Sequence, residues 1–435
     1  MESLAGVPVY RDVKLYCNTL NDMRIWEGDG WQEESMSWKE SCYVHAGLNG
    51  PSEVTLSGPD ALRLLSKVSI NDCYNWPIGT SKHLVMCNES GLIVNHGLAH
   101  RDSEDSFRTF ACFPWPVYMN GKLGYDVNVS FRDIFILQVA GPTSLHVLEK
   151  ATGENLRDVQ FLQARPTKIS GIDHDIEVSR IGMAGTLAYE LRGPGEAGPA
   201  VYDAVYQVGK ENNIKRLGWR TYMVNHVEGG FPQMNATFLT ALLADDEFMS
   251  TPMSGLIITD ITGSVDPADM RARFRTPAEV SWTWMAKFDH DFIGREAVES
   301  EAKDPKRKIV TLKWNPDDVM DTYASLFEKG EAYKVIELPF GQPQPSAGHA
   351  DRVTKNGRLV GISSGTTYSY YYRELISQCS IDIDQAEEGN EVIVHWGDYG
   401  KRIKEVRATV ARYPYLDLPR NQTYDLSSVP QLSIG

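Results

Sequence analysis

Alternating apolar and polar residues predict strands, and in two places the same short sequence follows the strand. Residues 53–57 alternate in this way, lead into Gly58-Pro59, and continue into an apolar pattern with helical spacing. Residues 135–140 are a second predicted strand, followed by Gly141-Pro142 and another helical pattern. Proline is favoured in the first turn of a helix, so each Gly-Pro marks a helix start. The repeated unit predicts two similar α+β lobes.

The remaining pattern adds strands and ends in a part of the chain that is rich in them. Residues 88–91 form a hairpin-type turn between two apolar strands. After a polar linker at 304–308, residues 309–415 predict a third, mostly β domain. Residues 1–50 show little periodicity, and we expect a leading segment that packs over the larger body with Trp38 buried. Further strands are expected at 83–87, 92–94, 107–113, 176–180 and 188–191, and a helix at 200–211.

One carboxylate stands directly before a glycine pair near the middle of the chain. Glu228 precedes Gly229 and Gly230 at the end of a predicted helix. Glycine at this place is typical of a helix C-terminal cap, which would leave Glu228 exposed. Paired glycines also let a ligand approach the backbone closely, so the carboxylate is suited to accept two donors from a flat heterocycle. The local pattern leaves both interpretations open.

Composition and charge narrow the class of protein. The 435 residues carry 43 Lys and Arg against 58 Asp and Glu, a net charge of −15. Such an acidic chain lacks the basic surface of a nucleic-acid-binding protein, and we expect no nucleic-acid partner. Six cysteines without Cys-x-x-Cys spacing predict free thiols in a reducing compartment. We find no signal-peptide pattern and no apolar run of about 20 residues, so we expect a cytoplasmic protein without a membrane partner.

Several familiar catalytic motifs are missing from the sequence. It has no G-x-G-x-x-G after a strand, no P-loop, no H-E-x-x-H and no G-x-S-x-G. The Asp-His-Asp clusters at 173–175 and 289–291 contain metal-ligating residue types. Neighbouring residues on an extended chain point to opposite sides, so one such cluster rarely closes a site. We therefore expect no metal centre.

Four stretches, together with the repeated units, carry a resemblance to a known family. They are NESGLI at 88–93, residues 218–230, DFIGREA at 291–297 and GRLVGISSGT at 357–366. They resemble the aminomethyltransferase (glycine cleavage T-protein) superfamily of tetrahydrofolate-binding enzymes, over nearly the whole chain beyond residue 50. Residues 287–295, 310–315, 323–327 and 367–370 are most similar to tetrahydrofolate-dependent aromatic O-demethylases of the vanillate, syringate or 3-O-methylgallate type. Demethylases of chlorinated methoxybenzoates such as dicamba are an equal alternative.

The resemblance implies an α+β fold in the form of a three-domain T-protein-like ring. Two related α+β lobes and a mostly β C-terminal domain would surround a central channel that holds tetrahydrofolate, with the pterin end buried. The implied boundaries are 1–53 and 132–235 for the first folate-binding lobe, 54–131 and 236–303 for the second, and 309–415 for the C-terminal domain.

The resemblance also implies roles for single residues. Glu228 would bind the pterin ring, and Tyr189 and Met183 are further candidates for contacts with the cofactor. The family's motif after the hairpin usually reads Asp-Asp, with one carboxylate beside the reacting pterin nitrogen, whereas this chain has Asn95-His96. That departure disfavours glycine cleavage. A histidine suits ether cleavage, because it can donate to a departing phenolate near neutral pH. A structural histidine between strands is the alternative interpretation of His96.

Candidates for substrate binding lie mostly before the KFDHD motif at 287–291. The demethylases in question are rich in tyrosine there, but this chain has three arginines, and no catalytic tyrosine can be assigned. A guanidinium matches a carboxylate, so Arg273 is a candidate to hold the substrate acid, and a solvated basic face is the alternative. Phe274, Trp282 and His45 are the further candidates.

We therefore expect a tetrahydrofolate-dependent aryl O-demethylase that acts on a small methoxylated aromatic acid. Its nucleophile is an amine and its leaving group can be protonated, so the reaction needs no metal. The alternatives are an aminomethyltransferase, which Asn95-His96 disfavours, and a demethylase of a sulfonium compound such as dimethylsulfoniopropionate. A folate-binding regulator or iron–sulfur assembly factor of the same fold is the non-enzymatic alternative.

Overall fold

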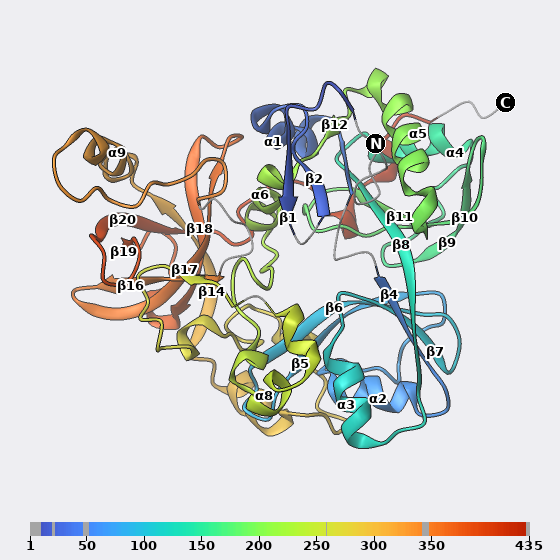
Figure 1. Ribbon diagram of the computed structural model, residues 1–435, viewed down its shortest axis with the longest axis horizontal. Coiled ribbons are helices and arrows are strands. Elements are labelled where there is room, and N and C mark those ends of the chain that lie inside the picture. Colours follow the sequence, from blue (N-terminus) through green and yellow to red (C-terminus); the bar gives the residue numbers. More distant parts are fainter. Residues whose placement is uncertain (1–9, 20–21, 47–51, 258, 342–347, 432–435) are drawn as a thin grey trace.

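The computed structural model describes residues 10–19, 22–46, 52–257, 259–341 and 348–431. Figure 1 shows three bodies grouped around the middle of the molecule, with the barrel on the left and two mixed lobes to its right. The class is α+β, as expected. Within the described residues, no helix is long and apolar enough to cross a membrane. The domain boundaries drawn from the sequence stay a prediction.

The upper lobe in Figure 1 is built around the long strand β8 (Asn128–Ala140). Its other strands are β1 (Leu15–Thr19), β2 (Asp22–Glu27), β3 (Tyr43–Ala46), β9 (Ala164–Ile169), β10 (Ile172–Ser179), β11 (Ala188–Pro194) and β12 (Lys215–Arg216). Its helices are α1 (Trp31–Glu40), α4 (Ser144–Thr152), α5 (Gly198–Gly209) and α6 (Trp219–Gly229). Helix α6 ends as predicted, with Gly230 as a left-handed cap at φ 71°.

The lower lobe has the matching arrangement. Its strands are β4 (Ser52–Ser57), β5 (Ser81–Cys87), β6 (Ile93–Arg101) and β7 (Ser106–Phe110), and its helices are α2 (Ala61–Val68), α3 (Trp115–Leu123), α7 (Asp246–Met249) and α8 (Arg295–Lys303). β8 joins the lobes, because its first half pairs with β4 and its second half with β11 and β3. The ten-stranded sheet therefore passes from one lobe into the other along a single strand.

The repeated strand–Gly-Pro–helix unit is confirmed in both lobes. Gly58 follows β4 with φ 126°, and Gly141 follows β8 with φ 130°. A Cβ at either position would meet a backbone carbonyl at 2.7 Å and 2.4 Å respectively. Only glycine combines this backbone angle with this close approach, so the two turns are built in the same way.

The third body is a closed barrel of six strands, which confirms the mostly β C-terminal domain. Its strands are β14 (Arg307–Trp314), β16 (Asp351–Lys355), β17 (Arg358–Ser369), β18 (Glu374–Asp382), β19 (Glu391–Trp396) and β20 (Lys404–Ala411), with helix α9 (Pro316–Ala324) beside them. The short strands β13 (Ile261–Thr262) and β15 (Gly348–His349) pair with each other outside the barrel. After the barrel the tail returns to the upper lobe, where the Asn421 side chain bonds Arg180 and the Ala188 carbonyl.

The leading segment is more ordered than its weak periodicity suggests, since it forms β1, β2, α1 and β3. Trp38 is fully buried, as predicted. Helix α1 is held by tertiary contacts: Glu34 accepts hydrogen bonds from the backbone N–H groups of Gly28, Asp29 and Gly218. This buried carboxylate ties α1 to the start of α6, which no local pattern could show.

Candidate functional site

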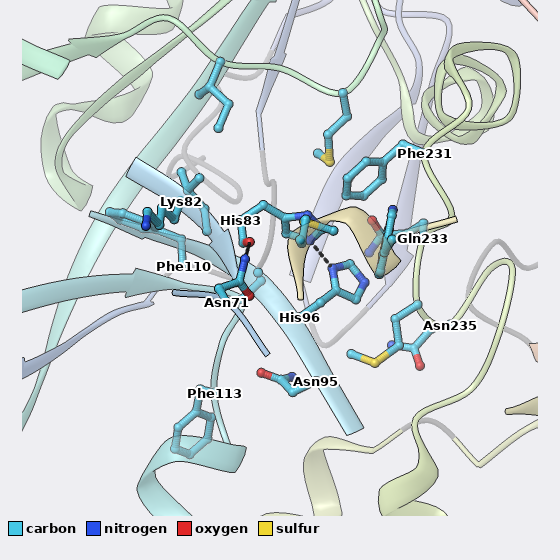
Figure 2. Close-up of a pocket in the computed structure, with 18 of the residues that line it drawn as sticks. Asn71, Lys82, His83, Asn95, His96, Phe110, Phe113, Phe231, Gln233 and Asn235 are labelled. Atoms are coloured by element: carbon cyan, nitrogen blue, oxygen red, sulfur yellow. Dashed lines mark hydrogen bonds between the residues drawn. The ribbon is translucent and has the colours of Figure 1, made fainter. Parts of the chain in front are cut away.

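A cavity of about 1110 Å³ lies where the two mixed lobes meet. Its walls come from β5, β6, β11 and α6, from loop residues 231–236 and 282–287, and from Arg420 and Gln422 of the tail. Figure 2 shows part of this lining. A pocket for one drug-sized ligand usually measures about 300–1,000 Å³, so the volume of this one lies just above that range.

Strand β6 places Asn95 and His96 in the cavity wall. Both side chains are buried, at 2% and 5% exposure. Among the described residues, Oδ1 of Asn95 and Nε2 of His96 have no hydrogen-bond partner. Buried polar atoms are nearly always paired in proteins, so these two are available to a ligand.

His96 lies against a second histidine and inside a ring of aromatic side chains. Nε2 of His83 is 3.1 Å from Nδ1 of His96, and Figure 2 shows the two rings side by side. Trp282, Phe231 and Phe238 lie with ring centroids 4.9, 5.9 and 5.9 Å from that of His96. Burial lowers the pKa of His83 to about 4 and holds the pKa of His96 well below its usual value. Both imidazoles are therefore neutral at pH 7.

One buried carboxylate faces the cavity, and sequence reasoning missed it. Glu190 on β11 is 6% exposed and lines the cavity, and Arg192 Nη2 donates to its Oε2 at 2.5 Å. Among the described lining residues, the only other acid is Asp72, whose Oδ1 already accepts the Asn75 N–H. Strand alternation places Glu190 on the face opposite Tyr189, but both faces are buried, so alternation alone could not show which one meets the cavity.

Glu228 lies elsewhere, in a closed cluster. It is fully buried at the end of α6 and is not part of the described cavity lining. Its Oε2 accepts from Lys39 Nζ at 2.5 Å and from Trp38 Nε1 at 3.2 Å, and its Oε1 accepts from Ser369 Oγ at 2.6 Å. The carboxylate thus joins α6 to α1 and to the barrel strand β17. It is not the exposed glutamate of a simple helix cap.

The other two predicted cofactor contacts, Met183 and Tyr189, lie in different places. Met183 lines the cavity, whereas Tyr189 is fully buried in the core of the upper lobe. Tyr189 and Glu190 are neighbours on β11, so their side chains point to opposite faces. The face of β11 that meets the cavity is therefore that of Glu190.

The arginines before residue 287 are used within the protein. Arg273 is 2% exposed and donates to the carbonyls of Thr262, Gly348 and Val265 at 2.9–3.0 Å. It fixes β13 against β15 and does not reach the described cavity lining. Phe274 beside it belongs to the core of the lower lobe. Both terminal nitrogens donate to carbonyls, and only Nε lacks a partner among the described residues, so the guanidinium is held within the protein and away from the described cavity lining.

Of the remaining candidates, Trp282 lines the cavity and His45 does not. His45 is buried, its Nδ1 donates to the Leu217 carbonyl at 2.8 Å, and its ring stacks on Tyr222 at 4.2 Å. Within the part of the chain that the structure describes, no three His, Cys, Asp or Glu side chains are grouped to hold a metal ion.

Comparison with known proteins fixes the family. Residues 24–240 match the family model described as the GCVT N-terminal domain. A sesamin methylene transferase from Sinomonas sp. (strain No.22) is 38% identical over 92% of this chain and 92% of its own length. The chain belongs to the GCVT family. A syringate O-demethylase from Sphingobium sp. (strain NBRC 103272 / SYK-6) is 27% identical over 91% of this chain and 90% of its own.

A solved structure supports the fold independently. The glycine cleavage aminomethyltransferase T from Bartonella henselae superposes with a TM-score of 0.68 over 95% of this chain and 96% of its own, at 15% identity. The T-protein-like architecture expected from the sequence is therefore confirmed. As a GCVT-family member with these relatives, the chain is an enzyme, a transferase of one-carbon groups that uses tetrahydrofolate as the acceptor.

Proposed function

We propose that this GCVT-family enzyme moves the methyl group of a methoxylated aromatic acid to tetrahydrofolate, giving 5-methyltetrahydrofolate and a phenol. The observation that carries the proposal is the Nε2 atom of His96, which is buried in an aromatic-walled cavity without a partner among the described residues. A donor there suits an aryl ether, whose oxygen gains negative charge as it leaves. Similarity to a syringate O-demethylase over nine-tenths of both chains supports the same class of reaction.

Glu190 is suited to hold the pterin. The aminopyrimidine edge of a pterin presents two N–H donors, and a carboxylate can accept both. Glu190 lines the cavity, and Arg192 Nη2 donates to its Oε2, which holds the orientation of the side chain. The Glu228 assignment stays a prediction beside this one. A pterin at Glu228 would have to displace Lys39 or Ser369 from the carboxylate oxygens.

His96 would stabilise the leaving oxygen. Tetrahydrofolate supplies the amine that receives the carbon. As the methyl–oxygen bond breaks, a hydrogen bond from Nε2–H of His96 offsets the charge on the aryl oxygen, beside the rings of Phe231 and Trp282. Holding both reactants in one cavity removes much of the entropic barrier.

A second candidate is transfer of a methylene group from a methylenedioxy-substituted ring. The observation that favours it is the 38% identity with a sesamin methylene transferase, over almost the full length of both chains. Such a substrate also leaves through an aryl oxygen, so His96 would keep its role. The substrate would be neutral and would need no guanidinium to bind it, which fits a described cavity lining that does not include Arg273.

An assay of the purified protein with tetrahydrofolate separates these functions. The panel contains methoxybenzoates, methylenedioxybenzenes, dimethylsulfoniopropionate and a glycine-cleavage intermediate. We expect a phenol and 5-methyltetrahydrofolate from a methoxybenzoate. A catechol with methylenetetrahydrofolate would favour the second candidate. If no aryl ether reacts while another substrate does, the proposal is wrong.

Removing the His96 ring tests its role. We expect His96→Ala to lower turnover about 10²- to 10⁴-fold, the usual contribution of a proton-donating group. Folate affinity, measured by calorimetry, should stay within a few-fold of wild type. Unchanged turnover with folate binding retained would remove His96 from the mechanism.

A further inference from the structure

His96 shares the cavity wall with a second imidazole that the proposed function has not used. His83 on β5 is half-buried, lines the same cavity and lies with its Nε2 3.1 Å from Nδ1 of His96. β5 and β6 are antiparallel, and Val85 stands opposite His96. His83 is therefore the diagonal neighbour of His96, which puts the two rings within reach of each other.

In each ring, one nitrogen contacts the other ring and the second nitrogen does not. Nε2 of His96 and Nδ1 of His83 make no hydrogen bond to a described residue. The rings of Phe231, Phe238 and Trp282 pack around His96 and offer no acceptor, and His226, the other histidine close enough to lower its pKa, makes no hydrogen bond to it. Four ring nitrogens thus make a continuous path, with a free position at either end.

We propose that His83 and His96 form a neutral proton relay between the two reactants, an inference that rests on the proposed transfer from an aryl ether to the folate amine. As the carbon–nitrogen bond forms and the carbon–oxygen bond breaks, the secondary amine loses a proton and the aryl oxygen gains one. Nδ1 of His83 takes the amine proton, the proton on Nε2 of His83 passes to Nδ1 of His96, and the proton on Nε2 of His96 passes to the oxygen.

The relay balances without an external acid. Both rings are neutral before and after the transfer, with their protons moved to the other nitrogens, and exchange with water restores the first tautomers. Burial fits this role, because it keeps the pKa values of both rings below neutral pH. A lone neutral imidazole that gave up its proton would become an anion, whereas each ring of the pair regains the proton that it donates. His83 is thus a catalytic residue of the relay, because its Nδ1 takes the proton of the reacting amine.

The test is the variant His83→Asn, assayed on aryl methyl ethers whose phenols differ in acidity. An asparagine amide can still donate to Nδ1 of His96 but cannot pass a proton on. We expect turnover of the unactivated ether to fall about 100-fold or more. Turnover of a para-nitro ether, whose phenolate leaves without protonation, should fall less than about threefold. His100→Asn is the control for loss of an imidazole from the same sheet, because His100 lies on the neighbouring strand β6 and bonds Ser81 outside the described cavity lining.

Two outcomes overturn the relay, and they are distinct from a failure of the proposed function. Equal losses for both ethers in His83→Asn would make His83 merely structural. ¹⁵N spectra of the histidine-labelled free protein at pH 7, assigned with the two single variants, should show both rings neutral and protonated at Nε2; an imidazolium or an Nδ1-protonated His96 contradicts the relay. A wild-type protein that acts on no aryl ether at all would instead remove the proposed function, and the relay with it.

Discussion

Two buried polar clusters, one around Glu228 and one around His96, differ in how far the protein itself satisfies them. Around Glu228, both carboxylate oxygens accept hydrogen bonds, from Lys39 and Trp38 on one side and from Ser369 on the other. Around His96, the outward ring nitrogen has no partner among the described residues. The first cluster connects three parts of the chain, and the second faces a cavity of about 1110 Å³.

The difference separates two uses of buried polar groups. A closed ion pair contributes little net stability, yet removing one partner is costly because the other charge stays buried. An unpaired nitrogen in a cavity lowers the stability of the free protein, and a ligand that bonds this nitrogen removes that cost. Residue type alone cannot tell these uses apart, since both clusters combine ionisable and aromatic side chains.

The largest expected effect comes from breaking the closed cluster. Lys39→Met leaves the Glu228 carboxylate buried without its cation, so we expect a loss of about 3–5 kcal/mol in the free energy of unfolding. Burial already lowers the pKa of Lys39 to about 8, against the opposing effect of Glu228. The measurement is urea unfolding followed by tryptophan fluorescence.

Two further variants control this result. Lys39→Met combined with Glu228→Leu removes both charges and should recover most of the loss. Lys303→Met breaks an exposed pair with Glu299 at 3.0 Å and should change stability by about 0.5 kcal/mol or less. A loss in Lys39→Met as small as that of Lys303→Met would mean that water reaches Glu228.

A smaller effect should separate the two candidate pterin carboxylates. Glu190→Gln keeps an acceptor for Arg192 but removes the charge, and we expect folate affinity to fall by about 1.5–3 kcal/mol, or roughly 10- to 150-fold. Calorimetric titration with 5-formyltetrahydrofolate, which is stable to oxidation, measures it. Glu228→Gln is the parallel variant, with its folding checked by circular dichroism. If Glu228→Gln weakens binding and Glu190→Gln does not, the assignment made from the sequence is correct.

Local patterns predicted those parts of the fold that local interactions determine. The strand–Gly-Pro–helix units and the Gly230 cap follow from backbone angles that only glycine accepts readily, so the sequence alone identified them. Helix α1 was missed because its ten residues carry no clear apolar stripe. Its anchor is Glu34, whose Oε2 accepts a hydrogen bond from the backbone N–H of Gly218, far away in the sequence.

The site was predictable only in part, for the same reason. Asn95 and His96 were found through the resemblance, because they stand where the family's motif after the hairpin has its two acids, and both line the cavity. Alternation along β11 shows that Tyr189 and Glu190 face opposite sides, but both faces are covered, so the sequence cannot say which one meets the cavity. Arg273 was chosen for its charge, and its partners are carbonyls that only the tertiary fold supplies.

The smallest expected effect concerns the cation for a substrate carboxylate. Lys287 is exposed and lines the cavity, and it has no ion pair with any described residue. Lys82 nearby already donates to the carbonyls of Asp72 and Asn75. If the substrate is an aromatic acid, Lys287→Met should raise its KM about two- to fivefold with kcat unchanged, since an exposed ion pair contributes about 0.2–1 kcal/mol.

The methyl ester of the same substrate is the matched control, because it lacks the carboxylate charge and should show the same KM in both proteins. Salt screens an exposed ion pair, so raising the salt concentration should reduce the KM difference between wild type and Lys287→Met for the acid. The KM values for the ester should not change. Equal KM changes for acid and ester would show that Lys287 acts through packing. A wild-type preference for the ester or for a neutral methylenedioxy ring would favour methylene transfer, and the cavity would then need no cation at this position.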